Sequence, residues 1–223
     1  MTAVRTGIGP GLARFQRMTS IFWAGWGNRL FGVKQALEGL VEREQHVLGK
    51  LFGRKKRNRW AVDRLHQAIL AQALKPGFYF PGGARDNFSG RFEMTSLHAA
   101  LMFRRLRDFG PAGNELAQEC FDALFDGFDE ALRDMGTGDL SVGKKIRKMG
   151  EAFYGRARAY DEALSATAKS DALENTLQRN LGIGEDYVAS FASYVTVAEE
   201  TLQRHTEESI MSGEVNWPKP VTK

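Results

Sequence analysis

The stretch Gly113–Met135, GNELAQECFDALFDGFDEALRDM, decides the fold. Apolar residues recur along it at spacings of three and four, and acidic residues fill half of the remaining positions. This period indicates one long amphipathic α-helix. Such a broad apolar face needs other helices to cover it, so the pattern predicts helix-on-helix packing. The apolar positions are Ala117, Cys120, Phe121, Leu124, Phe125, Phe128, Ala131, Leu132 and Met135.

The flanking sequence predicts five further helices, separated by short segments that contain Gly or Pro. No stretch alternates apolar and polar residues as a strand would, so the fold class is all-α, an irregular bundle of about six helices. The domain should span residues 47–212, with a flexible N-terminal extension at 1–46 and a frayed C-terminal tail at 213–223. The five helices are expected at Asn58–Leu74, Arg91–Arg107, Val142–Leu164, Ala172–Asn180 and Glu185–Met211.

Composition narrows the class of protein. Of the 223 residues 43% are hydrophobic and 26% charged, which is typical of a soluble globule. A single cysteine, Cys120, excludes an internal disulfide framework and fits a reducing compartment. The most apolar early stretch, Ile21–Val33, contains Asn28 and Arg29 and is shorter than the roughly 20 apolar residues a membrane span needs. The sequence therefore predicts a protein that is soluble or peripheral to a membrane.

Charge is divided unevenly along the chain. Residues 1–110 carry 19 Lys and Arg against 7 Asp and Glu, whereas residues 111–223 carry 12 against 20. The basic half indicates an anionic partner such as RNA, anionic lipid or an acidic protein face; the alternative is a solvated surface without a partner. Within that half, residues 1–37 have no acidic residue. They are similar to an organelle transit peptide, or form an interfacial anchor, or are a loosely ordered appendix.

Candidate catalytic and metal sites are weak. Residues Gly138–Lys144 have the spacing of a phosphate-binding loop, but a helix precedes them and Lys145 stands where that loop has a Ser or Thr. The four histidines are dispersed, and His98 is expected to be a core histidine that is hydrogen-bonded to a neighbour. Cys120 lies on the apolar face of its helix and is expected to be inert. The sequence predicts no enzyme, no cofactor and no metal site.

The segment Gly143–Arg158, GKKIRKMGEAFYGRAR, combines an apolar stripe with a basic surface. Ile146, Met149 and Phe153 share the buried face, and Lys and Arg cover much of the rest. Two interior glycines, each costing about 1 kcal/mol relative to Ala, suggest close helix packing or the approach of a partner. Basic residues interleaved with aromatics at Lys50–Arg64 and the arginines at 104–107 add to this candidate surface.

These residues carry a resemblance to a known family. GDLSVGKKIRKMGEAFYGR, at Gly138–Arg156, resembles the signature of the ubiquinol–cytochrome c reductase assembly chaperones. PGFY at Pro76–Tyr79 and GRFE at Gly90–Glu93 resemble earlier blocks of that family, in the same order. The similarity covers roughly residues 60–164 and continues more weakly to about 204. The loop PGGARDNFSG, Pro81–Gly90, departs from the family pattern, and residues 1–46 match nothing in it.

The resemblance implies a helical chaperone without catalytic residues that binds newly made cytochrome b. It further implies contact with a ribosome or an anionic membrane surface and a possible small partner subunit. It implies no binding to specific DNA. A bacterial member would act in the cytoplasm, peripheral to the inner membrane, and a mitochondrial one on the matrix side. The alternative is a basic helical RNA- or ribosome-binding module or membrane-surface adaptor without a cytochrome client. The expected partner-binding residues are Phe78, Tyr79, Arg91, Lys144, Lys145, Arg147, Lys148, Phe153, Tyr154 and Arg156.

Overall fold

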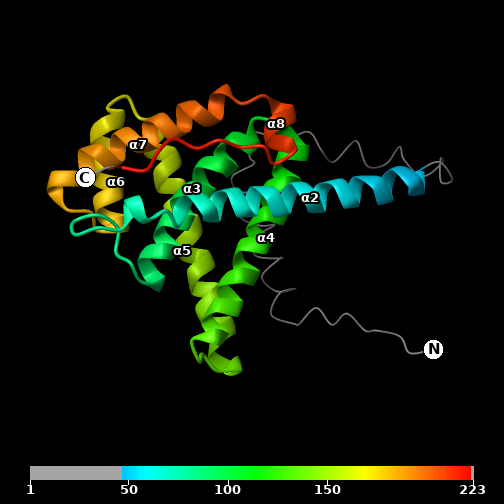
Figure 1. Ribbon diagram of the computed structural model, residues 1–223, viewed down its shortest axis with the longest axis horizontal. Coiled ribbons are helices and arrows are strands. Elements are labelled where there is room, and N and C mark those ends of the chain that lie inside the picture. Colours follow the sequence, from blue (N-terminus) through cyan, green and yellow to red (C-terminus); the bar gives the residue numbers. More distant parts are fainter. Residues whose placement is uncertain (1–46, 222–223) are drawn as a thin grey trace.

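The computed structural model describes residues 47–221, and its regular elements in that range are all helical (Figure 1). The all-α fold expected from the sequence is confirmed. Residues 1–46, where an extension was expected, lie outside the described part of the chain. The elements are α2 (Val47–Ala73), the 3-10 turn η1 (Pro76–Phe78), α3 (Phe88–Arg107), α4 (Gly110–Asp134), α5 (Asp139–Ser165), α6 (Lys169–Leu181), α7 (Glu185–Arg204) and α8 (Glu207–Met211).

Helix α3 forms the centre of the bundle. It packs against α2, α4, α5, α6 and α7, and 14 of its 20 residues are buried. A helix that is covered on nearly every side must have small or apolar residues all round, as the run Thr95–Phe103 does. Every other long helix therefore takes its position from α3.

Helices α2 to α6 all begin earlier than their hydrophobic pattern predicts, and α3 and α4 show why. Asn87 caps α3, its side-chain oxygen accepting a 2.9 Å hydrogen bond from the Gly90 amide, so the helix starts at Phe88. Helix α4 starts at Gly110 because Pro111 lies in its first turn, where the missing N–H has no helical acceptor to lose. Pro111 thus opens the helix that it was expected to precede.

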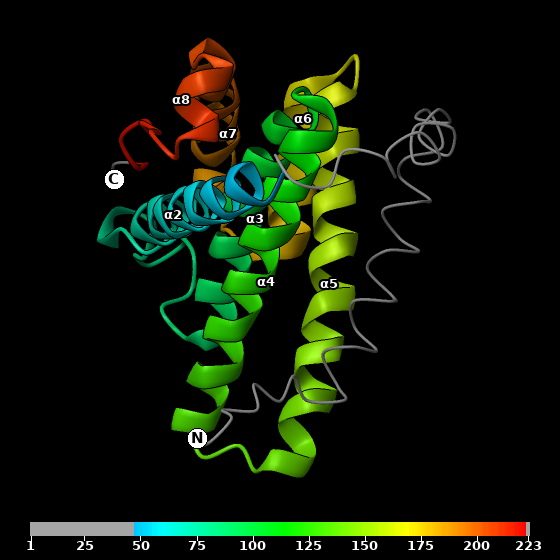
Figure 2. The ribbon, with the colours of Figure 1, turned by 90° about the vertical axis from the view of Figure 1, so that its right-hand side faces the viewer.

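Helices α4 and α5 form a long hairpin whose free end points away from the rest of the molecule. Figure 2 shows them side by side, with the connecting turn at the opposite end from α7 and α8. The turn is short, from Met135 to Gly138, and Gly136 has a φ of +81°. That left-handed conformation is one that glycine adopts without steric cost.

The C-terminal region differs from the expectation in two ways. The single helix expected over Glu185–Met211 is wrong: α7 ends at Arg204, and Thr206 caps a separate helix α8 by accepting from the Ser209 amide. The expectation that the C-terminal tail is frayed is also wrong for residues up to 221. Val221 is buried, and Gln72 on α2 donates a 2.9 Å hydrogen bond to the Pro218 carbonyl. The tail therefore packs across the body.

Candidate functional site: the helical hairpin and its basic face

The inner faces of α4 and α5 hold an aromatic cluster. Phe121 stacks on Phe125 with ring centroids 4.3 Å apart and on Tyr154 at 5.3 Å. Phe153 meets Phe121 edge-on at 5.2 Å and is only 3% exposed. Such ring pairs add about 0.5–1.5 kcal/mol each beyond the area they bury. The cluster therefore holds the two helices together where the hairpin joins the body.

The outer face of α5 near the free end is basic. Lys144, Lys145, Arg147 and Lys148 are all exposed, as a partner-binding role requires. Arg147 lies 3.8 Å from Glu151, and the Lys145 ammonium donates to the Thr137 hydroxyl at 3.0 Å. Within the described residues, none of the three lysines forms an ion pair. Their charge is thus available to an outside partner.

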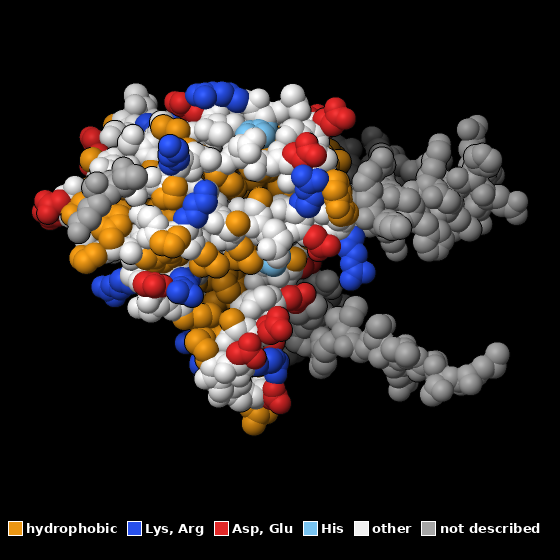
Figure 3. Space-filling view, in the orientation of Figure 1, with side chains coloured by type: hydrophobic (Ala, Val, Ile, Leu, Met, Phe, Trp, Pro, Cys, Tyr) orange, Lys and Arg blue, Asp and Glu red, His pale blue; other side chains and the backbone are white. Residues whose placement is uncertain are grey.

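The outer face of α4 is acidic. Asp122 and Asp126 lie one turn apart on it, and Asp122 accepts a 2.8 Å hydrogen bond from Gln118. Burial raises the pKa of both carboxyls, and neighbouring carboxylates raise it further. Figure 3 shows acidic side chains gathered along one side of the hairpin. The hairpin consequently presents a different charge to each side.

Arg156 does not join the basic face. Its guanidinium binds both carboxylate oxygens of Glu93 on α3, one of them at 2.5 Å, and donates to the Ala152 carbonyl at 3.1 Å. The Glu93 side chain is only 9% exposed. Arg156 and Glu93 come from two of the sequence blocks that carry the family resemblance, so this ion pair brings those blocks together. Arg91 instead pairs with Asp86 at the surface, at 2.8 Å.

The aromatic loop after α2 packs on the body. Phe78 is fully buried, and its ring lies 4.9 Å from that of Tyr194 and 5.5 Å from that of His98. The Tyr79 hydroxyl donates a 2.8 Å hydrogen bond to the Ala73 carbonyl, and burial raises the pKa of Tyr79 to about 12. Phe78 and Phe153 are among the expected partner-binding residues, and the structure places both in the core.

His98 is the buried, hydrogen-bonded histidine that the sequence predicts. Its Nδ1 donates to the Met94 carbonyl at 2.8 Å, so Nε2 accepts from the Tyr194 hydroxyl at 2.6 Å. That hydroxyl in turn accepts from Gln72 at 2.9 Å. Burial lowers the pKa of His98 to about 4, so the ring is neutral. This chain of hydrogen bonds ties α2, α3 and α7 at the centre of the bundle.

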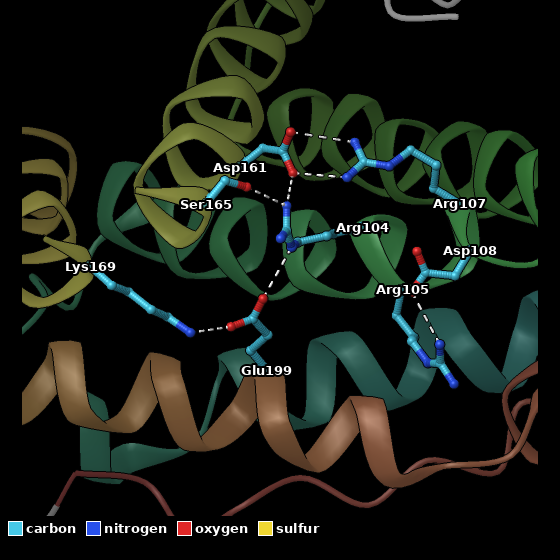
Figure 4. A network of polar contacts seen from close by, with 8 residues as sticks. All are labelled: Arg104, Arg105, Arg107, Asp108, Asp161, Ser165, Lys169 and Glu199. Carbon is cyan, nitrogen blue, oxygen red and sulfur yellow. Dashed lines mark hydrogen bonds and ion pairs between the residues drawn. The ribbon is translucent and has the colours of Figure 1, made fainter. Parts of the chain in front are cut away.

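The arginines of residues 104–107 are neutralised within the fold, which the sequence did not show. Arg104 binds Asp161 and, at 3.1 Å, Glu199, and Arg107 binds Asp161 at 2.9 Å (Figure 4). Lys169 completes the network by contacting Glu199 at 2.5 Å. Burial acts to raise the pKa of Asp161, but the two guanidiniums outweigh it and hold that pKa below its usual value. The network links α3, α5, α6 and α7 by ion pairs. Because these arginines are paired, residues 104–107 do not contribute to the basic surface.

The features considered for chemistry have structural roles here. The phosphate-loop-like residues Gly138–Lys144 form the hairpin turn and the first turn of α5, with a helix on each side. Cys120 is fully buried, and burial raises the pKa of its thiol to about 12. Among the residues that the structure describes, no His, Cys, Asp and Glu side chains cluster as metal ligands would. What the site offers to other molecules is a charged hairpin.

The fold is an all-helical bundle from which the α4–α5 hairpin projects, with a basic face on α5 and acidic residues on α4. The matching family model is described as ubiquinol-cytochrome C chaperone and covers residues 82–217. The chain belongs to that family. In the described range no helix is long and apolar enough to cross a membrane.

Two relatives illustrate the similarity. The crystal structure of the Cbp3 homolog from Brucella abortus shares 35% sequence identity with this chain, at a TM-score of 0.67; the match covers 76% of this chain and 96% of that one. Ubiquinol-cytochrome-c reductase complex assembly factor 1 from Xenopus laevis is 22% identical over 181 residues, covering 75% of this chain and 88% of its own length. The resemblance read from the sequence blocks is thereby confirmed.

Proposed function

We propose that this chain is an assembly chaperone of ubiquinol–cytochrome c reductase that binds newly made cytochrome b. Membership of the chaperone family supports an assembly role, and the Xenopus relative is named for the same complex. Cytochrome b as the client comes from the resemblance of the signature at Gly138–Arg156. The chain acts by binding and not by catalysis.

One observation carries the proposal. Lysines that form no ion pair within the described residues lie beside partly buried apolar residues on the same hairpin. On α5, Ile146 lies between Lys145 and Lys148 in the sequence and Met149 follows Lys148, and both apolar side chains are only partly buried against the core. Phe128 on α4 is likewise partly buried, and its ring lies 6.4 Å from that of Phe88 at the start of α3. A membrane protein held before insertion offers apolar helices and charged connecting loops, and this surface can contact both.

The space-filling view supports a contact surface at the base of the hairpin. Figure 3 shows hydrophobic side chains exposed in a recess between the body and the hairpin, with Lys and Arg nearby. Contiguous apolar surface rimmed by charge is typical of a site that binds another protein. A client seated there would have to extend toward the free end of α5 to reach Lys144, Lys145 and Lys148.

The proposal is tested by capture of cytochrome b in cells. The full chain and a Lys144→Glu, Lys145→Glu, Lys148→Glu variant are each affinity-purified from cells making labelled cytochrome b. A matched control reverses the exposed residues Arg59, Arg204 and Lys219, which changes the charge equally but away from the hairpin. We expect the hairpin variant to lose about tenfold or more of the captured cytochrome b, because several desolvated contacts vanish together. Equal capture by both variants would exclude the basic face as the client site.

A variant that is partly unfolded would also capture less cytochrome b, so the folding of each variant is checked by circular dichroism and urea unfolding. All three lysines are exposed, and exposed substitutions change stability by no more than about 0.5 kcal/mol each. A second variant, Ile146→Ser with Met149→Ser, removes the apolar part of the same surface. Capture that is lost in both hairpin variants and kept in the control supports a mixed apolar and cationic client surface.

A further inference from the structure

The free end of the hairpin carries two exposed hydrophobic side chains that nothing in the fold explains. Leu140, in the first turn of α5, is 102% exposed, and Met135, directly after α4, is 57% exposed. Figure 3 shows a hydrophobic side chain at the outermost point of the hairpin. A single exposed Leu on a flat protein surface is common. Two exposed apolar residues at the tip of a projection are different, because the tip is the part of the molecule that first contacts a partner surface.

Cationic side chains stand directly behind this tip. Lys144 and Lys148 lie four and eight residues after Leu140, so all three share one side of α5. Lys145 reaches back to the turn, where it donates to the Thr137 hydroxyl. Residues 133–148 contain five Lys and Arg against two Asp and Glu. Asp139 and Asp129 are paired with Arg133, and Asp126, Glu130 and Asp134 add negative charge on the last turns of α4. The positive charge of the tip is therefore confined to its α5 side.

We propose that the tip of the α4–α5 hairpin docks on an anionic lipid bilayer, with Leu140 and Met135 entering the headgroup region and Lys144, Lys145 and Lys148 binding lipid phosphates. The arrangement is that of an interfacial anchor, in which apolar residues enter the bilayer boundary and lysines remain at the phosphate level. This docking uses the same three lysines as the proposed client surface, but it goes beyond that function because it needs no client.

Other occupants fit the tip less well. RNA would use the lysines but gains nothing from a fully exposed Leu140 in a helix. A stable protein interface needs about 800 Å² on each partner, which the convex end of one helical hairpin with two apolar residues cannot supply. A bilayer is the partner that accepts a small apolar tip and three lysines on one helix together, because it is soft and presents many phosphates.

The test measures binding of the full chain to vesicles by sedimentation, without cytochrome b. Vesicles of phosphatidylcholine with 30 mol% phosphatidylglycerol, on the order of a strongly anionic leaflet, are compared with phosphatidylcholine alone. Reversing Lys144, Lys145 and Lys148 should weaken binding by about a hundredfold, since each lysine near an anionic surface contributes about fivefold. Met135→Ser with Leu140→Ser should weaken it by about tenfold or more without altering charge. The Arg59, Arg204 and Lys219 reversal serves as the control, with a smaller loss.

A probe at position 140 then separates tip docking from binding elsewhere on the chain. Leu140→Cys can be labelled selectively with an environment-sensitive fluorophore, because Cys120 is fully buried. We expect a blue shift of emission on anionic vesicles, no shift on neutral ones, and no shift for the same label at Asn175→Cys on α6. Sedimentation without a shift at position 140 places the membrane contact elsewhere and overturns the proposal. Absence of vesicle binding, or binding to RNA that the Leu140 variant does not alter, overturns it as well.

Failure of this experiment and failure of the proposed function are distinguishable. A chain that captures cytochrome b but ignores vesicles is a chaperone whose tip does not dock on lipid. A chain that binds anionic vesicles through position 140 but does not capture cytochrome b has the membrane contact without the client.

Discussion

Removal of one partner of the Arg156–Glu93 ion pair should strongly destabilise the protein. The perturbation is Arg156→Met, which keeps most of the side-chain volume and removes the charge. Glu93 would then be left as a carboxylate that is 9% exposed and has lost its bidentate partner. Breaking a buried pair in this way costs roughly 3–5 kcal/mol. Because the Arg156 side chain is itself 26% exposed and water can reach the site, we expect about 3 kcal/mol.

Urea unfolding followed by circular dichroism measures this cost. The matched control is Arg158→Met, two residues further along α5, where the partner Glu162 is 63% exposed; its loss should cost less than about 1 kcal/mol. The double variant Glu93→Met with Arg156→Met should recover most of the lost stability, because no charge is left buried alone. If Arg156→Met is no worse than Arg158→Met, the ion pair does not hold the base of the hairpin.

Three further predictions concern buried groups. Burial lowers the pKa of His98 to about 4 in the folded chain against 6.5 unfolded, so its contribution to stability is complete above about pH 6.5 and is lost as the pH falls toward 4. As the pH falls from 7 to 4.5, the free energy of unfolding should decrease by roughly 2–3 kcal/mol more for the wild type than for His98→Gln. An equal decrease in both proteins would mean that His98 is not the titrating group. Cys120, whose pKa is raised to about 12, should not react with a disulfide reagent such as DTNB until urea unfolds the chain, and rapid labelling of the native protein would contradict its burial. Trp217→Ala should lower stability by about 2 kcal/mol in urea unfolding, because its ring packs 5.2 Å from that of His98; no change would show that the tail is not docked.

The helices could be predicted from the sequence because their apolar period and the Gly and Pro residues between them are local signals. The pattern of Gly113–Met135 identified the body of α4, although it missed the first turn, since Pro111 is compatible with either side of a helix start. His98 was correctly placed in the core because it shares a helix face with Met94 and Leu101. Met135 was assigned inward by the same period, but it lies beyond the last covered turn and is 57% exposed.

The candidate site was only partly predictable, because ion pairs join residues that are distant in sequence. Arg104 and Arg156 read as members of a basic surface until Asp161 and Glu93 are seen beside them. The docked tail likewise has no periodic signal, since Trp217 is fixed by a ring on α3 more than a hundred residues earlier. The exposure of Lys144, Lys145 and Lys148 was predictable because lysines on the polar side of an amphipathic helix need no distant partner to be recognised.

The level of cytochrome b in cells that lack this chain tests the central claim most directly. Reduced-minus-oxidised spectra and ubiquinol–cytochrome c reductase activity are measured in a deletion strain, with and without the full chain restored. We expect loss of cytochrome b and of that activity, with other respiratory haem proteins retained and full recovery on restoration. A deletion strain that keeps its normal cytochrome b and reductase activity would contradict a role in the assembly of this complex.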